Sequence, residues 1–161
     1  MTDQNQGTAA NEAPVFRLQK LYVKDLSFEN PNAPECFTVQ TGNQPKVEVN
    51  LTLENKKLAG DDNYEVLIKI TAKVTHGDDA KVMFIIELDH CGIFTIKNIP
   101  AEHMNAVLAV DCPTMMFPYT RQIVSQTTVD GGFVPFLMEP VNFLALYQNA
   151  QKQQQDKQQE Q

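Results

Sequence analysis

The stretch that decides the fold is Tyr64-Glu65-Val66-Leu67-Ile68-Lys69-Ile70-Thr71-Ala72-Lys73-Val74-Thr75. Its even-numbered positions carry apolar or aromatic side chains, while most of its odd-numbered positions carry charged residues or threonine. Successive side chains of a β-strand point to opposite faces of the sheet. The alternation therefore predicts a strand with one buried face and one face toward solvent.

Three further strands are predicted around this one. Residues 47–54 alternate in the same way. A turn at residues 76–79 has the glycine and aspartates of hairpin connections, and a strand is expected after it over residues 80–90. Residues 15–29 alternate less regularly, and we place this fourth strand at an edge of the sheet.

The strand over residues 80–90 has apolar side chains on both faces. Met83 and Ile85 share one face with charged neighbours, while the opposite face is apolar from Val82 to Leu88. A loop of the same chain would explain this pattern by covering Met83 and Ile85. A contact with another subunit or a partner would also explain it and is the favoured interpretation, while both stay open from the sequence.

The apolar spacing becomes helical after Pro100. One helix is expected from there to Cys112-Pro113, because the residue before a proline is biased away from helical geometry. A second helix is expected from about Met116 to Val129, closed by Gly131-Gly132. A third is expected to open at Glu139-Pro140. The connection that begins with the two glycines shows no functional signature of its own.

Strands come first and helices afterwards, which predicts an α+β fold: a four-stranded antiparallel sheet with helices packed on one face. A length of 161 residues fits one domain, which we expect over residues 14–147. Residues 1–13 and the Gln-rich residues 148–161 contain few large apolar side chains. Both ends are therefore predicted to be disordered.

The net charge is −7, and no basic cluster interrupts it. This argues against nucleic acid as a partner and suits partners that carry basic patches. No apolar run approaches the roughly 20 residues that span a bilayer, and the polar N-terminus is unlike a signal peptide. Three scattered cysteines are typical of free thiols in a reducing cytoplasm, which is the location we expect.

Patterns for catalysis or cofactor binding are missing from the sequence: there is no phosphate loop, dinucleotide fingerprint or nucleophile elbow. The histidines His76, His90 and His103 lack metal-ligand spacing, so neither a metal nor another cofactor is expected. Cys112 precedes a proline and has no evident base, which favours a buried structural thiol over a nucleophile. These observations indicate a binding protein and not an enzyme.

Asp25 and Glu29 form an acidic stripe on the first predicted strand. They are four residues apart, so they project from the same face with Cα atoms about 13 Å apart at roughly 3.3 Å per residue. That exceeds the separation of about 5 to 9.5 Å between the paired carboxylates of glycosidases. A plain solvated face and a docking surface for a basic partner both remain possible interpretations.

Several blocks of the sequence resemble the SecB family of bacterial protein-export chaperones. The first block, residues 22–34, reads YVKDLSFENPNAP and is similar to the opening signature of that family. Three further blocks match in order, and the likeness spans about residues 16–147. They are Gly92-Ile93-Phe94, Cys112-Pro113 followed by Phe117-Pro118-Tyr119-Thr120-Arg121, and Pro140-Val141-Asn142-Phe143 with Ala145-Leu146.

The resemblance implies a cytoplasmic homotetramer, a dimer of dimers, that binds unfolded secretory precursors without ATP and delivers them to the motor ATPase SecA. In this family an acidic face of the sheet receives the basic, zinc-bearing C-terminal segment of SecA. The matching positions here are Asp25, Glu29, Ile85 and Glu87. The positions that match the contact between dimers are Ile86, Leu88 and His90.

A chaperone of this kind needs an apolar groove, because apolar burial holds unrelated chains without requiring a particular sequence. Six residues are candidates for its lining, and an ordinary core position is an alternative for each: Phe37, Phe94, Met115, Met116, Phe117 and Tyr119. Other functions stay open as well. They are a SecB-like chaperone of a toxin–antitoxin system, a non-enzymatic oligomeric scaffold and, least supported, a small enzyme of unknown type.

Overall fold

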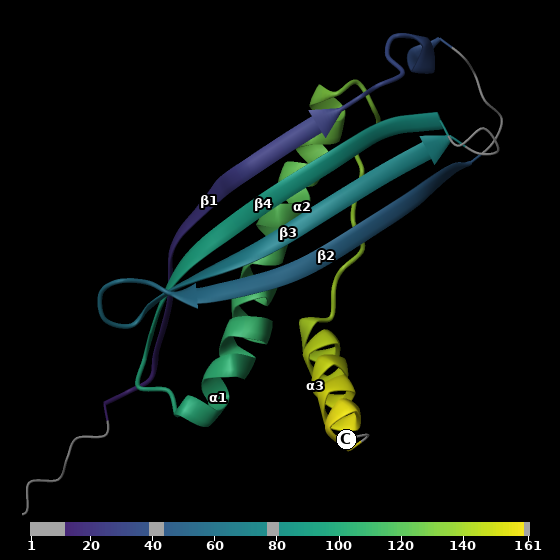
Figure 1. Cartoon of the computed structure of the whole chain (residues 1–161). Coiled ribbons are helices and arrows are strands. Elements are labelled where there is room, and N and C mark those ends of the chain that lie inside the picture. The colour runs from purple at the N-terminus through teal and green to yellow at the C-terminus, as the bar shows by residue number, and fades with distance from the viewer. Residues whose placement is uncertain (1–11, 39–43, 77–80, 160–161) are drawn as a thin grey trace, which may run out of the picture.

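The computed structural model describes residues 12–38, 44–76 and 81–159. They form a four-stranded antiparallel sheet with helices on one face (Figure 1). The strand order is β1-β4-β3-β2, with bounds Val15–Glu29 for β1, Lys81–Lys97 for β4, Asn63–His76 for β3 and Pro45–Lys57 for β2. The predicted fold class is confirmed, and β1 lies at an edge as expected. The predicted turn after His76 lies outside the described residues.

Strand β4 extends further than the sequence interpretation placed it, to Lys97 instead of His90. Phe94 and Ile96 continue the buried alternation beyond Gly92, and both have no more than 1% of their surface exposed. In the neighbouring strand, Ile70 pairs with Leu88 in register. The core is therefore the even-numbered face of β3 and β4, where each buried aliphatic side chain contributes about 1.5–3 kcal/mol of transfer free energy.

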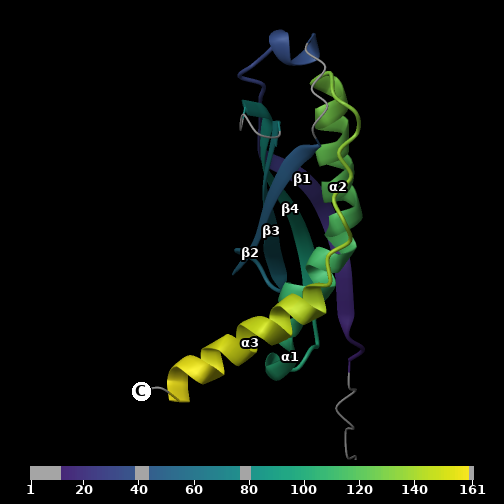
Figure 2. The same ribbon diagram turned by 90° about the vertical axis from the view of Figure 1, so that its right-hand side faces the viewer.

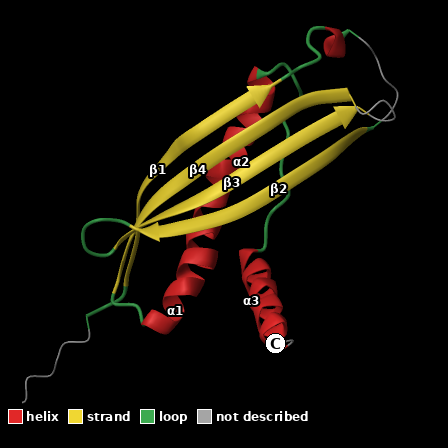
Figure 3. Cartoon of the chain, in the orientation of Figure 1, coloured by secondary structure: helices red, strands yellow, loops and turns green. Residues whose placement is uncertain are grey.

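One continuous helical rod crosses the core face of the sheet (Figure 3). It consists of α1 (Ala101–Ala106), a π-helical turn (Val107–Asp111) and α2 (Cys112–Asp130). The predicted helix end at Cys112-Pro113 is therefore wrong. The N–H of Cys112 bonds to the carbonyl of Val107, one residue further back than in an α-helix. Pro113 has no N–H to donate, and the wide π-helical turn lets the helix continue through it.

Helix α2 ends where the sequence predicted, at Gly131-Gly132. The N–H of Gly132 donates to the Val129 carbonyl (3.0 Å), and its φ of 90° lies in the left-handed region that favours glycine. Residues 133–142 then run back along α2 to α3 (Phe143–Gln159) (Figures 1 and 2). Helix α3 opens later than predicted, because the Asn142 side chain accepts the N–H of Ala145 (3.0 Å) as a cap.

Residues 148–159, which belong to the tail predicted to be disordered, are helical in the structure. Helix α3 continues to Gln159 and points away from the sheet, and the side chains of residues 148–159 are exposed (Figure 2). Glutamine and lysine are good helix formers, so a segment that cannot form a core can still extend a helix that is already started. Residues 1–11 and 160–161 lie outside the described residues.

Candidate functional site

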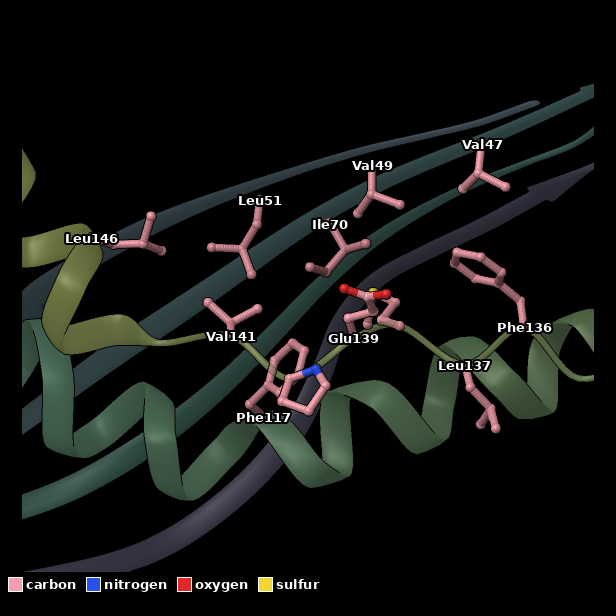
Figure 4. Close-up of a pocket in the computed structure, with 12 residues that line it drawn as sticks. Val47, Val49, Leu51, Ile70, Phe117, Phe136, Leu137, Glu139, Val141 and Leu146 are labelled. Atoms are coloured by element: carbon pink, nitrogen blue, oxygen red, sulfur yellow. The ribbon is translucent and has the colours of Figure 1, made fainter.

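An apolar groove of about 670 Å³ lies on the helix side of the sheet, beside the edge strand β2 (Figure 4). Val47, Val49 and Leu51 of β2 form one wall, and Ile70 of β3 continues it. Phe117 of α2 lies at the base of the groove. The opposite wall comes from the connection and the start of α3: Phe136, Leu137, Met138, Glu139, Pro140, Val141 and Leu146.

Several of the wall residues are unusually open for apolar side chains. Val49 is 43% exposed and Leu137 is 61% exposed. Val49 lies at the edge of the sheet, because β2 is its last strand. A contiguous exposed apolar surface of this kind is typical of a binding site. Among the described lining residues, Glu139 alone carries a charge.

The six predicted groove residues do not lie together. Phe117 is in the groove, whereas Phe94 and Met116 are fully buried in the core and cannot contact a client there. Phe37 is exposed at the far end of the sheet, where its ring stands 5.1 Å from that of Phe133.

The last two predicted groove residues, Met115 and Tyr119, are exposed on α2. Tyr119 lines a second hollow of about 520 Å³ between α2 and β1, together with Leu21, Leu26 and Ile123. The residues that sequence reasoning missed are those of β2 and of the connection after Gly132. The alternation of Val47, Val49 and Leu51 was recognisable, but nothing local indicated that this face would stay uncovered.

The four residues predicted to bind SecA gather on the open face of the sheet, away from the helices. In the β1–β4 register, Ser27 pairs with Glu87 and Glu29 pairs with Ile85. Asp25 lies on the same face and pairs with Asp89, a further carboxylate that the sequence interpretation did not include. Asp25, Glu29 and Glu87 are exposed, so the face presents negative charge to solvent.

The residues predicted for the contact between dimers lie on the opposite, helix-covered face of the sheet. Ile86, Leu88 and His90 point to the helix side and are 0%, 1% and 2% exposed in the single chain. His90 Nδ1 lies 2.8 Å from the Thr120 hydroxyl of α2. Side chains without accessible surface cannot touch another subunit directly. The prediction of a direct contact is therefore corrected: these residues hold α2 against the sheet.

Acid is expected to destabilise the fold through His90. Burial lowers the pKa of its ring below the ordinary 6.5, so it stays neutral in the folded state at pH values that protonate the unfolded chain. The free energy of unfolding should fall as the pH drops below about 6.5, by up to about 1.4 kcal/mol per pH unit. Denaturant titrations at pH 7.5 and 5.5 measure this loss. His90→Gln should lose less, and an equal loss in that variant would contradict the assignment.

At the other end of the open face, the Glu65 carboxylate of β3 contacts side chains of β1 and β2. Its carboxylate accepts a short hydrogen bond from the Tyr22 hydroxyl, and the Nζ atoms of Lys24 and Lys56 lie 3.3 and 3.7 Å away. The Tyr22 hydrogen bond is the main cause that lowers the pKa of Glu65, while burial raises the pKa of Tyr22. These contacts join β1, β2 and β3, which indicates a structural role.

The Cys112 thiol is fully buried, and burial together with Asp111 raises its pKa to about 12. The thiol therefore stays protonated at neutral pH, which supports the structural role expected from the sequence.

Among residues 12–38, 44–76 and 81–159, no helix has the length and apolar content needed to cross a membrane.

A comparison with protein families shows which family the chain is related to. A family model described as "Preprotein translocase subunit SecB" matches residues 9–155. The chain belongs to the SecB family. A "Protein-export protein SecB" from Desulfotalea psychrophila is 59% identical over 156 residues, which cover 97% of each chain. Another SecB, from Magnetococcus marinus, is 45% identical over 150 residues and 93% of each chain.

Among solved structures, a SecB-like chaperone of Mycobacterium tuberculosis, determined with a peptide of an antitoxin, has the same fold. Its TM-score is 0.64 at 12% identity, over 78% of this chain and 90% of that one. An identity this low shows shared architecture alone. The resemblance to SecB found in the sequence blocks is thus confirmed by the full-length relatives.

Proposed function

We propose that this SecB protein is an ATP-independent chaperone that holds unfolded secretory precursors and delivers them to SecA. The observation that carries the proposal is the open apolar groove between β2 and residues 136–141. Its relatives, up to 59% identical, are named protein-export proteins. The antitoxin-bound relative is only 12% identical, so export is favoured over a toxin–antitoxin role.

The groove suits clients that share no sequence. Apolar burial stabilises a complex by about 25 cal/mol per Å², whatever the order of the side chains. Val47, Val49 and Leu51 offer this surface on a rigid strand, so little entropy is lost in forming the site. Contacts in several subunits add by avidity, and binding the unfolded form opposes client folding by mass action.

The acidic face suits the basic, zinc-bearing C-terminal segment of SecA. Asp25, Glu29 and Glu87 are exposed there beside Ile85, an apolar side chain that a partner can cover. Opposite charge steers encounter and selects basic partners. A net charge of −7 per chain strengthens the same preference at longer range.

The assembly is proposed to be a homotetramer, a dimer of dimers. Exposed apolar side chains on β1 and α2 offer a surface for it: Val23, Leu26, Met115, Tyr119 and Val129 are each at least 40% exposed. Ile86, Leu88 and His90 lie beneath α2 and would influence assembly by positioning that helix.

The proposed function predicts that the purified protein, without nucleotide, suppresses aggregation of an unfolded preprotein. Static light scattering should give a mass about four times that of the chain. An aggregation assay on a chemically unfolded preprotein diluted from denaturant measures the holding activity, and a folded form of the same protein serves as control. A monomer that leaves aggregation unchanged would overturn the proposal.

A further inference from the structure

Lys69 stands in one cross-strand row with two carboxylates of the open face. Asp25 on β1 pairs in register with Asp89 on β4, and Asp89 pairs in register with Lys69 on β3. The Lys69 Nζ lies 4.0 Å from Asp89 Oδ1. Within the described parts of the chain, Asp25, Glu29 and Glu87 have no ion-pair partner. Among the residues that the structure describes, Lys69 is therefore the lysine that forms an ion pair with this row.

The Lys69–Asp89 pair is loose. A separation of 4.0 Å is longer than a hydrogen bond, and the Lys69 side chain is 47% exposed. Exposed pairs of this kind contribute little to stability, because solvent screens them and holding a long side chain costs entropy. The ammonium can therefore leave Asp89 without the loss of a hydrogen bond.

The row also explains why a lysine is useful at this position. Like charges that face each other on neighbouring strands are unfavourable, and Asp25 and Asp89 are such a pair. Lys69 offsets part of their repulsion in the free protein. The same ammonium weakens the negative potential that a basic partner would meet.

We infer that Lys69 is an internal competitor for the acidic face and sets its affinity for basic partners. In the free protein its ammonium occupies Asp89, and a cationic group of the partner takes its place on docking. The inference rests on the proposed docking of a basic segment at this face, and it adds Asp89 and Lys69 to the residues that determine specificity. Lys69 acts here by charge, through Asp89.

Replacing Lys69 should tighten binding. Lys69→Gln is expected to bind the zinc-loaded basic segment of SecA about three- to fivefold more tightly at low salt. The gain should shrink as the ionic strength rises, because exposed charges are screened. Lys69→Arg keeps the charge and should match the original protein. Isothermal titration at two salt concentrations measures these affinities.

The matched control is Lys56→Gln, which removes the same charge from the Glu65 cluster at the other end of the face. If it tightens binding as much as Lys69→Gln, the effect is one of net charge and the inference fails. Unchanged or weaker binding by Lys69→Gln also overturns it. In an Asp89→Asn background, removing Lys69 should give a smaller gain.

The proposed docking of a basic segment can fail separately from the role inferred for Lys69. If the unaltered protein does not bind the basic segment, the docking proposal falls and the competitor role falls with it. If the unaltered protein binds and only the Lys69→Gln result departs from expectation, the docking stands and Lys69 has no competing role.

Discussion

Introducing an aspartate at Val49 is expected to abolish the holding of unfolded clients. Val49 lies in the wall of the groove, and an aspartate there would have to lose its hydration whenever an apolar client segment covers it. An unpaired charge buried in this way costs several kcal/mol, so client affinity should fall at least about a hundredfold. Titration of a fluorescently labelled unfolded preprotein, together with the aggregation assay, measures the loss.

The neighbouring residue provides a matched control. Asn50→Asp adds the same charge one position further along β2, where the side chain points to the open face. It should leave client binding unchanged. Val49 is 43% exposed, so its replacement is expected to leave the far-ultraviolet circular dichroism spectrum intact. Full client binding by a folded Val49→Asp variant would mean that clients use another surface.

Reversing two charges on the open face is expected to abolish SecA docking while client binding is retained. The variant carries Asp25→Lys and Glu29→Lys, which turn two attractions of about 1 kcal/mol into repulsions of similar size. Affinity for the basic SecA segment at low salt should fall by about two to three orders of magnitude. Titration with that segment and with an unfolded preprotein separates the two activities.

The control for this variant is a double reversal elsewhere. Asp61→Lys with Glu102→Lys changes the net charge equally, at exposed positions in the β2–β3 connection and on α1. It should keep most of the SecA affinity. An equal loss in both variants would show that net charge decides docking and that the face itself is not the site.

The strands could be predicted because their signal is local. Within residues 64–75, the even-numbered side chains are predicted on one face of the strand and the odd-numbered ones on the other. In the structure, the even-numbered side chains do form the core. The same rule, carried past His90, would have assigned Phe94 to the core with Phe84 and Ile86. Ending the strand too early allowed Phe94 to be considered for the groove.

The helical rod and the groove could not be predicted in the same way. A π-helical turn lets the rod continue through Cys112-Pro113, and no residue pattern announces such a turn. The groove has walls from β2 and from residues 136–141, which meet only after the chain has reversed direction at Gly131-Gly132. Apolar composition alone does not distinguish a covered position such as Met116 from an open one such as Val49.

The two surfaces of the sheet have a consequence for the order of events in export. Val49 and its groove open on the helix side, whereas Asp25, Glu29 and Glu87 project from the other side of the same sheet. If the acidic face is the docking surface for SecA, as proposed above, a chaperone that already carries a client keeps this surface free. On that proposal, recruitment of the motor would not have to wait for release of the client, and a ternary complex could form. Within it, transfer becomes intramolecular, and a high effective concentration limits escape of the client to aggregation.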